Sequence, residues 1–292
     1  MEPLVTVGVP THNRPELLRR TLAALAKQDH SNIEVVVADN ATSGDSAGRV
    51  VQSFVGVIPD LRYVRHEVNI GAVENFLYLL SVARGRYFMW LADDDEISPN
   101  YIASLVKVLQ SEPDASSAAG HWVLMQDEHL GREMPTSRFE HRSQVVRALR
   151  FIWRTDDAFF YALHRTDVLR QASFRGYWWP NRDSVWNWAY VYLLDVVLKG
   201  RVLVARDPSV QFINHDYTPK AGVIASRTLL AVATGACRRV NVHLLYWEKC
   251  ARELNVLWMP LVVATSIVSL AREGSMKVLH RMIRMTGRES AA

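Results

Sequence analysis

Residues 87–95 read Tyr-Phe-Met-Trp-Leu-Ala-Asp-Asp-Asp, an apolar run that leads directly into three carboxylates. A short uninterrupted apolar run is typical of a strand that is buried on both faces of a parallel sheet. The three acids would then stand at the carboxyl end of that strand, which is where open α/β sheets bind their ligands. The alternative interpretation is a solvated acidic turn before a helix.

Adjacent carboxylates repel one another unless a cation lies among them. If the segment is extended, successive side chains point to opposite sides, so we expect Asp93 and Asp95 to face one site and Asp94 to face away. Mg²⁺ is often held in proteins by one or two carboxylates together with substrate phosphates. The run therefore predicts a site for a divalent cation and a phosphate-bearing ligand.

The chain on either side of this run alternates between strand and helix patterns. We expect strands over residues 4–9, 33–38 and 61–65, and helices over about 15–28, 72–83 and 98–110. Asn13 is expected to cap the first helix, and Pro15 suits its first turn. Alternation at this spacing predicts an α/β fold whose mostly parallel sheet is flanked by helices on both faces.

The second half of the chain is less regular. We expect strands over residues 118–125, 202–205 and 210–213, and helices over 142–154, 184–198 and from about 225 onward. The segment 174–183 is dense in aromatic residues, which either stack on a sugar ring or fill the core.

The composition excludes several classes of protein. Of 292 residues, 49% are hydrophobic and 22% are charged, as in folded soluble proteins, and the net charge of +4 is too small to indicate nucleic-acid binding. Cys237 and Cys250 are the only cysteines, so we expect no disulfide framework, no zinc site and a reducing, cytoplasmic environment. We expect no signal peptide. No GxGxxG follows the first strand and no GxxxxGK[ST] occurs, which argues against nicotinamide-binding and P-loop proteins.

Four stretches, taken together, point to a known family. They are Val-Gly-Val-Pro-Thr-His-Asn-Arg (7–14), Val-Val-Val-Ala-Asp-Asn-Ala (35–41), Asn-Ile-Gly-Ala-Val-Glu-Asn-Phe (69–76) and Trp-Leu-Ala-Asp-Asp-Asp-Glu (90–96). In this order and at these spacings, residues 4–217 resemble the family-2 glycosyltransferases, which have the GT-A fold. The Leu-Ala-Asp-Asp-Asp form looks most like bacterial members that build O-antigen, capsule and other surface glycans.

The resemblance implies where a nucleotide would bind. Asp39 would accept a hydrogen bond from the imide N–H of a pyrimidine, and Asn69 and Gly71 would border the diphosphate. The acids at 93–95 stand where the metal-binding DxD motif lies, and His215 is the candidate for a later metal or diphosphate ligand, with a structural histidine as the alternative. The implied nucleotide-binding residues are Pro10, Thr11, Asn13, Asp39, Asn69, Gly71, Asp93 and Asp94, and the implied metal ligands are Asp93, Asp95 and His215.

The resemblance also implies a catalytic base. Inverting members place a carboxylate at the start of a helix that faces the acceptor, often as the Asp of a Glu-Asp pair. Asp183 occupies that position here, but Arg182 replaces the preceding acid, which is a departure from the pattern. A helix cap is the competing role for Asp183, and Asp156, Asp157 and Asp216 are the other candidate bases.

The predicted function is metal-assisted, inverting transfer of a sugar from a nucleotide-diphosphate sugar, UDP or dTDP, to a glycan, lipid-linked or small-molecule hydroxyl. The cofactor would be Mn²⁺ or Mg²⁺. The alternatives are a sugar nucleotidyltransferase, although residues 10–15 lack its Gly-rich loop, and a non-catalytic glycan-binding relic of the fold. We expect a GT-A, Rossmann-like domain over 1–220, with a nucleotide-sugar half to about 125 and an acceptor half from about 126, and a helical C-terminal extension over 221–292.

The C-terminal region suggests a further contact. Residues 257–270 are almost wholly apolar, but a membrane-spanning helix needs about 20 residues. The residues that follow are basic: Arg272, Lys277, His280, Arg281, Arg284 and Arg288. These helices either lie on the anionic inner face of the cell membrane or pack on the catalytic domain or on a second copy of the chain.

Overall fold

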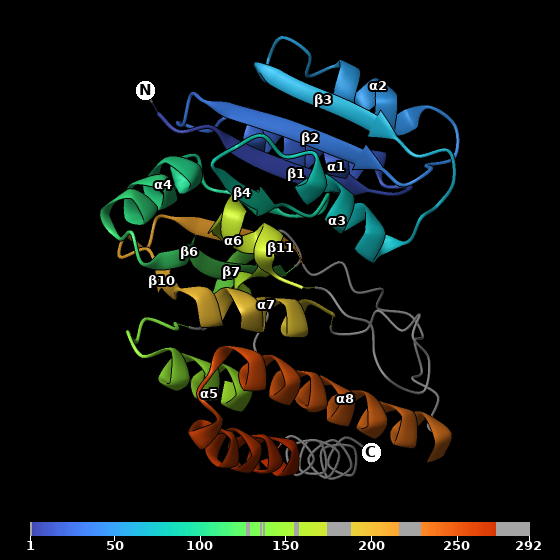
Figure 1. The fold of residues 1–292 in the computed structure, drawn as a ribbon. Helices are drawn as coiled ribbons and strands as arrows, with labels where there is room; N and C mark the ends of the chain where they lie inside the picture. The colour runs from blue at the N-terminus through green and yellow to red at the C-terminus, as the bar shows by residue number, and fades with distance from the viewer. Residues whose placement is uncertain are drawn as a thin grey trace, which may run out of the picture. The chain divides into compact units, whose positions relative to one another are not determined.

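The computed structural model describes residues 2–126, 129–134, 136, 138–154, 158–173, 188–215 and 229–272. It divides into two compact units, each built from three separate stretches of the chain (Figure 1). The first unit comprises Met1–Glu140, Asp157–Ser173 and Lys199–Val223, and the second comprises His141–Asp156, Phe174–Leu198 and Ile224–Ala292. The domain boundary predicted near residue 220 stays a prediction.

The first unit contains a seven-stranded sheet in the order β10-β6-β9-β4-β1-β2-β3. Strands β3, β2, β1 and β4 are parallel, as are β6 and β10, and only β9 runs antiparallel to its neighbours β4 and β6. The strands are β1 (Val5–Thr11), β2 (Ile33–Asp39), β3 (Asp60–Arg65), β4 (Tyr87–Trp90), β6 (Ala115–Ala119), β9 (Leu163–Arg165) and β10 (Arg201–Val204). The helices between them are α1 (Pro15–Leu25), α2 (Ser46–Gln52), α3 (Ala72–Ser81), α4 (Tyr101–Ser111), the 3-10 turn η1 (Ala158–Tyr161) and α6 (Thr166–Gln171). The predicted mostly parallel α/β architecture is confirmed.

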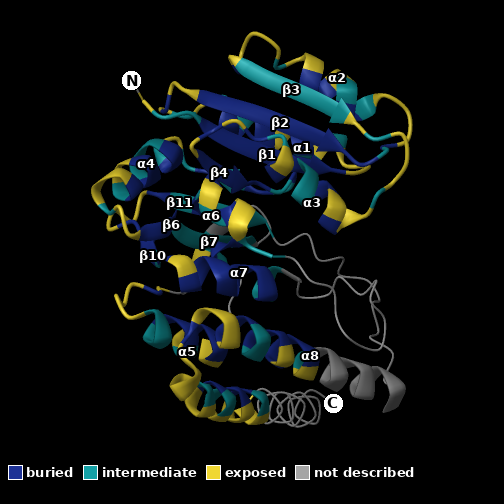
Figure 2. Cartoon of the chain, in the orientation of Figure 1, coloured by how far each residue is buried: buried dark blue, intermediate teal, exposed yellow. Residues whose placement is uncertain are grey.

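The central strands are buried along their whole length (Figure 2). Both faces of β1, β2 and β4 are covered, which is why their sequences are continuous apolar runs rather than alternating patterns. Polar side chains that are to meet a ligand can therefore stand only at the strand ends.

A second sheet, in the order β5-β11-β7-β8, was not predicted. Its strands are β5 (Glu96–Ile97), β7 (His121–Gln126), β8 (His129–Met134) and β11 (Gln211–His215). The single strand predicted over 118–125 is wrong, because the chain passes from one sheet to the other at Gly120. A Cβ atom there would lie 2.4 Å from the Tyr101 ring and 2.5 Å from the Val210 carbonyl oxygen, so only glycine allows the crossing.

The start of α1 also differs from the prediction. The helix begins at Pro15 with Arg14 as its N-cap residue, and no side chain caps it. Asn13 instead has a positive φ of 57°, a conformation that asparagine tolerates better than most residues, and its side chain serves a neighbouring loop.

The described part of the second unit is helical. It holds α5 (Gln144–Arg154), α7 (Trp188–Lys199), α8 (Leu229–Glu253), the 3-10 turn η2 (Val256–Trp258) and a helix over residues 259–272. The buried Arg147 of α5 donates hydrogen bonds to the Val197 and Leu198 carbonyls at the end of α7. Carbonyls in the last turn of a helix have no partner within the helix, so Arg147 satisfies them. Lys249 of α8 forms a buried ion pair with Asp195 of α7. Within the described helices, none is long and apolar enough to cross a membrane.

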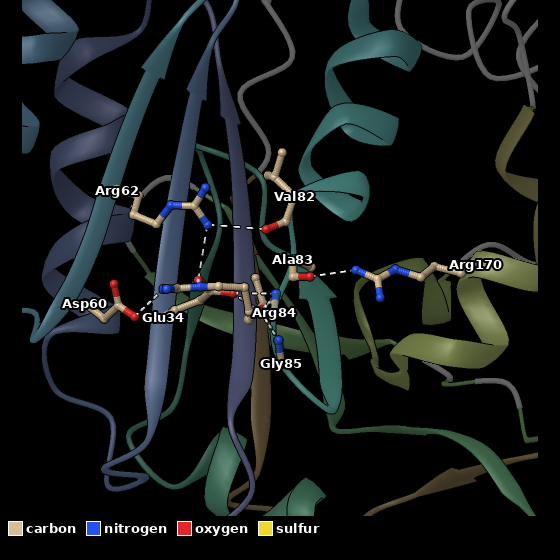
Figure 3. A network of polar contacts seen from close by, with 9 residues as sticks. Glu34, Asp60, Arg62, Val82, Ala83, Arg84, Gly85 and Arg170 are labelled. Carbon is tan, nitrogen blue, oxygen red and sulfur yellow. Dashed lines mark hydrogen bonds and ion pairs between the residues drawn. The ribbon is translucent and has the colours of Figure 1, made fainter.

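A buried carboxylate holds the amino edge of the large sheet together (Figure 3). Glu34 of β2 is fully buried and accepts hydrogen bonds from Thr6 Oγ1 (2.5 Å), the Arg84 backbone N–H (2.7 Å) and Arg84 Nε (2.5 Å). Arg62 adds a fourth donor at 3.3 Å, and Asp60 binds the far side of Arg84. Burial alone would raise the pKa of Glu34, but these hydrogen bonds outweigh it and leave the pKa below its ordinary value.

We predict that Glu34→Gln lowers the free energy of unfolding by about 1–3 kcal/mol, because hydrogen bonds to a charged acceptor are lost. Since the pKa of Glu34 is lowered by folding, this stabilisation is present above the ordinary pKa of about 4.5 and disappears as the pH falls through the lowered value. Urea unfolding at pH 7 and in acid would measure both effects. Asp60→Asn is the matched control: it removes a half-exposed partner of Arg84 and should cost less than about 1 kcal/mol. Equal losses in the two variants would contradict the assignment.

Candidate functional site

The carboxyl ends of β1, β2 and β4 meet at one edge of the sheet. Thr11 and Asp39 are register partners at the ends of β1 and β2, and β4 runs parallel to β1 on the other side. The Thr11 hydroxyl donates a 2.6 Å hydrogen bond to Asp93 Oδ2, across 82 residues of sequence. The structure therefore brings together the strand-end residues that the sequence singled out.

Asp39 fixes the turn that follows β2. Its side chain is buried, Oδ1 accepts from the Thr42 backbone N–H (2.8 Å), and Oδ2 accepts from the Tyr63 hydroxyl (2.7 Å). Burial and the contact with Asp39 both raise the pKa of Tyr63, so the phenol stays a donor. Each carboxylate oxygen already has one protein donor, so a nucleotide base would have to use the remaining lone pairs. The predicted role of Asp39 in base recognition stays a prediction.

Asn13 joins the first two loops of this edge. Its backbone N–H donates to Thr42 Oγ1 (2.9 Å), and its side-chain oxygen accepts from the Ser43 backbone N–H (2.8 Å). The left-handed backbone at Asn13 and at Ala41, with a φ of 61°, allows the loops to face each other. The residue that was predicted to cap a helix thus acts as a bridge between loops.

Asn40 joins the third loop, and the sequence analysis missed it. Its amide nitrogen donates to Asn69 Oδ1 (2.9 Å), and its amide oxygen accepts from the Ile70 backbone N–H (2.8 Å). Asn69 Oδ1 also accepts from the backbone N–H of Gly71, whose φ of 86° favours glycine. The sequence feature that could have identified Asn40 is its position directly after Asp39, in the polar segment that follows β2.

The acidic run forms a turn rather than an extended segment. The Asp95 backbone N–H donates to the Ala92 carbonyl at 3.1 Å, which closes a tight turn, so the argument from strand alternation was wrong. The turn still separates the three acids: Asp93 and Asp95 are buried, whereas the side chain of Asp94 is 23% exposed and receives a 3.0 Å ion pair from Arg14.

Burial makes the ionised forms of Asp93 and Asp95 less favourable than they are in water. Burial raises the pKa of Asp93 to about 6, and the hydrogen bond from Thr11 offsets only part of this rise. Burial and then the charge of Asp94 raise the pKa of Asp95 to about 8, although Asn214 Nδ2 donates to it at 2.7 Å. Paired buried carboxylates with raised pKa values are common at functional sites, because a ligand or cation relieves their repulsion.

His215 lies beside this run, at the end of β11. Its ring nitrogen Nε2 is 2.9 Å from Glu96 Oε1 and 3.1 Å from Arg20, which itself pairs with Glu96 at 2.9 Å. The ring thus contacts Glu96, whereas it is the His215 backbone that hydrogen-bonds the Asp95 carboxylate. Arg14, Arg20 and Glu96 were not among the predicted site residues: Arg14 and Glu96 stand in the quoted stretches 7–14 and 90–96 but were given no role, and Arg20 is a single charged residue on α1.

The described residues supply two carboxylate ligands for a divalent cation. Asp93 and Asp95 supply hard oxygen ligands that lack a full complement of cationic partners, which suits Mg²⁺ or Mn²⁺. Among the residues that the structure describes, no three His, Cys, Asp or Glu side chains stand close enough to hold an ion together. The predicted base Asp183, its neighbour Arg182 and the other candidates Asp156, Asp157 and Asp216 lie outside the described residues.

Comparison with known proteins decides the family. A family model described as Glycosyl transferase family 2 matches residues 6–172, more than half of the chain. The chain belongs to glycosyl transferase family 2. This confirms the resemblance found in the sequence.

Several curated relatives are named as bacterial glycosyltransferases. The chain is 30% identical over 103 residues to the putative colanic acid biosynthesis glycosyl transferase WcaA of Escherichia coli, covering 35% of this chain and 36% of that protein. It is 23% identical over 185 residues to the Campylobacter jejuni GalNAc(5)-diNAcBac-PP-undecaprenol beta-1,3-glucosyltransferase (63% and 59%), and 28% identical over 159 residues to the Salmonella typhimurium abequosyltransferase RfbV (54% and 43%). The chain thus spans less than two thirds of the length of each of these relatives.

Solved structures confirm the GT-A fold. Residues 1–349 of TarS from S. aureus superpose with a TM-score of 0.69 at 17% identity, covering 91% of this chain and 71% of that one. The mannosyltransferase PcManGT from Pyrobaculum calidifontis, in complex with GDP-Man and Mn²⁺, gives 0.55 at 16% identity, covering 98% and 81%. At these identities the likeness concerns the fold alone.

We predict that Asn40→Ala lowers the free energy of unfolding by about 1–2 kcal/mol, because it breaks two hydrogen bonds and leaves the Ile70 N–H without its acceptor. Thermal or urea unfolding would measure the loss. Asn32→Ala removes a single exposed contact with the Glu2 carbonyl and should stay within about 0.5 kcal/mol of the wild type. If Asn40→Ala were as stable as Asn32→Ala, the loops would not depend on this side chain.

Proposed function

We propose that the protein is an inverting glycosyltransferase that moves a sugar from a nucleotide-diphosphate sugar to a hydroxyl group of a glycan, lipid-linked or small-molecule acceptor. The observation that carries the proposal is the buried pair Asp93 and Asp95, linked through Thr11 to the end of β1 in a chain of this family. The pair stands at the sheet edge where α/β folds bind nucleotides.

The loops after β1, β2 and β3 are the proposed nucleotide site. They carry Pro10, Thr11, Asn13, Asp39, Asn69 and Gly71, with Asn40 as the amide that ties them together. Structural neighbours of this chain have been solved with UDP, UDP-GlcNAc and GDP-Man, which supports a nucleotide-sugar donor. We propose UDP or dTDP, because the buried Asp39 suits the imide N–H of a pyrimidine.

Asp93 and Asp95 are the proposed ligands of Mn²⁺ or Mg²⁺, with His215 as a third ligand once its ring leaves Glu96. A bound divalent cation would neutralise the charge that develops on the departing diphosphate. Arg14 lies on the solvent side of the same acids and supplies a positive charge next to the proposed diphosphate.

Asp183 is the proposed general base. It would take the proton of the acceptor hydroxyl while that oxygen bonds to the anomeric carbon from the face opposite the diphosphate. The bond from the anomeric carbon to the diphosphate breaks at the same time, and its electron pair leaves with the nucleoside diphosphate. This step needs no covalent intermediate with the protein.

We predict that UDP with Mn²⁺ raises the melting temperature of the wild type more than ADP with Mn²⁺ does, because ligand binding to the native state stabilises it. Asp93→Asn and Asp95→Asn should abolish the Mn²⁺-dependent part of this shift and of donor hydrolysis. Asp167→Asn, at an exposed acid in the first turn of α6, is the matched control and should behave as the wild type. A wild type that neither binds nor hydrolyses any nucleotide sugar with Mn²⁺ would favour a non-catalytic protein.

We predict that Asp183→Asn lowers kcat by about 10²- to 10⁴-fold while donor binding is kept, because asparagine cannot accept the proton. Asparagine caps helices about as well as aspartate, so a purely structural role predicts near-normal stability and near-normal turnover. Steady-state kinetics and a donor titration on the same preparation separate these roles. A variant that keeps more than about a tenth of the wild-type rate would move the base to another carboxylate.

A further inference from the structure

One side of the helix over residues 259–272 exposes apolar side chains, and the other side buries one valine and two hydroxyl groups. With the preceding turn η2, the helix carries six exposed large apolar side chains. The exposed residues are Val256, Leu257, Trp258, Leu261, Ile267 and Val268, and the buried ones are Val262, Ser266 and Ser269. A helix on a water-soluble surface normally has the opposite arrangement.

Specific hydrogen bonds fix this orientation. Ser266 Oγ accepts from Trp247 Nε1 of α8 at 2.8 Å, and Ser269 Oγ donates to the Ile152 carbonyl of α5 at 3.0 Å. Rotating the helix to hide its apolar face would break both bonds and would bury no polar partner in their place. The outward apolar face is therefore built into the packing of this unit.

The exposed apolar residues form a continuous stripe. Leu261, Ala264 and Val268 follow one another at spacings of three and four, which places them on one face of the helix, and Leu257 of turn η2 precedes them by four residues. Leu257 is 81% exposed and Val268 51% exposed, so large side chains at both ends of the stripe face solvent, and the neighbouring Ile267 is 57% exposed. Contiguous exposed apolar surface of this kind marks a binding face.

The charges around the stripe indicate its partner. No Asp, Glu, Lys or Arg occurs between Leu254 and Ala271. Arg272 ends the described helix, Glu273 follows it, and the sequence from 274 to 288 holds Lys277, Arg281, Arg284 and Arg288 and no acid. An apolar face followed in the sequence by an excess of basic residues complements an anionic lipid surface, and exposed Trp258 is of the type enriched at the level of lipid headgroups.

We propose that the face formed by residues 256–271 binds an anionic membrane, with the helix lying in the plane of the headgroups. The apolar segment over residues 257–270 is shorter than the roughly 20 residues that a bilayer-spanning helix needs, so the proposed contact is peripheral. The inference does not rest on the proposed sugar transfer, but it would bring the enzyme to the surface on which a lipid-linked acceptor is presented.

Flotation of the full chain with vesicles tests the proposal. We expect the wild type to float with phosphatidylcholine vesicles that contain 30% phosphatidylglycerol, and much less with pure phosphatidylcholine. The double variant Leu257→Glu, Ile267→Glu changes only exposed positions and should lower the ratio of bound to free protein at least about tenfold. Val55→Glu, Val57→Glu places the same charges at two equally exposed apolar positions of the first unit and should float as the wild type does.

Three outcomes would overturn the proposal. The first is a wild type that does not float with anionic vesicles, and the second is a double variant that floats as well as the control. The third is a wild type that is dimeric by light scattering, fails to float, and becomes monomeric in the Leu257→Glu, Ile267→Glu variant, which would assign the face to a second copy of the chain. Circular dichroism of each variant confirms that the helices remain folded.

Discussion

The hydrogen bond from Thr11 to Asp93 is the contact on which the site depends. It links the ends of β1 and β4, which are buried on both faces and can carry polar side chains only beyond their last apolar residues. Because parallel strands present their carboxyl ends at the same edge, residues 82 positions apart in the sequence become neighbours there. The loops after β1, β2 and β3 are then tied to one another by Asn13 and Asn40, so hydrogen bonds within the protein hold this edge in place.

The buried carboxylates at the two edges of the same sheet have pKa values that are shifted in opposite directions. At the amino edge, Glu34 has donors on both oxygens, and its pKa lies below the ordinary value. At the carboxyl edge, burial raises the pKa values of Asp93 and Asp95, and the charge of Asp94 adds to the rise. Glu34 is satisfied by donors within the protein, whereas buried carboxylates with raised pKa values cluster at functional sites.

Much of the fold could be predicted because strands that are buried on both faces have uninterrupted apolar sequences. The second sheet could not, because β7 follows β6 after the single residue Gly120, and the change of sheet depends on the absence of a Cβ atom at that glycine. The acids of the site were found from their place after a strand. The turn that these acids form was not predicted, because the hydrogen bond between Asp95 and Ala92 joins backbone groups and does not depend on the type of residue. The ion pairs of Arg14 with Asp94 and of Arg20 with Glu96 form only through the tertiary fold.

Residues 257–270 show the same limit for the second unit. Hydropathy identifies the segment as apolar, but it does not tell whether that apolar surface is hidden by the protein or left for a partner. The answer lies in the small polar residues: because Ser266 and Ser269 find acceptors and donors on α8 and α5, the serine side of the helix faces inward and the leucine side is left outward. These two hydrogen bonds, together with the buried Val262, hold this face of the helix inward, and the hydropathy of the sequence alone does not distinguish the inward face from the outward one.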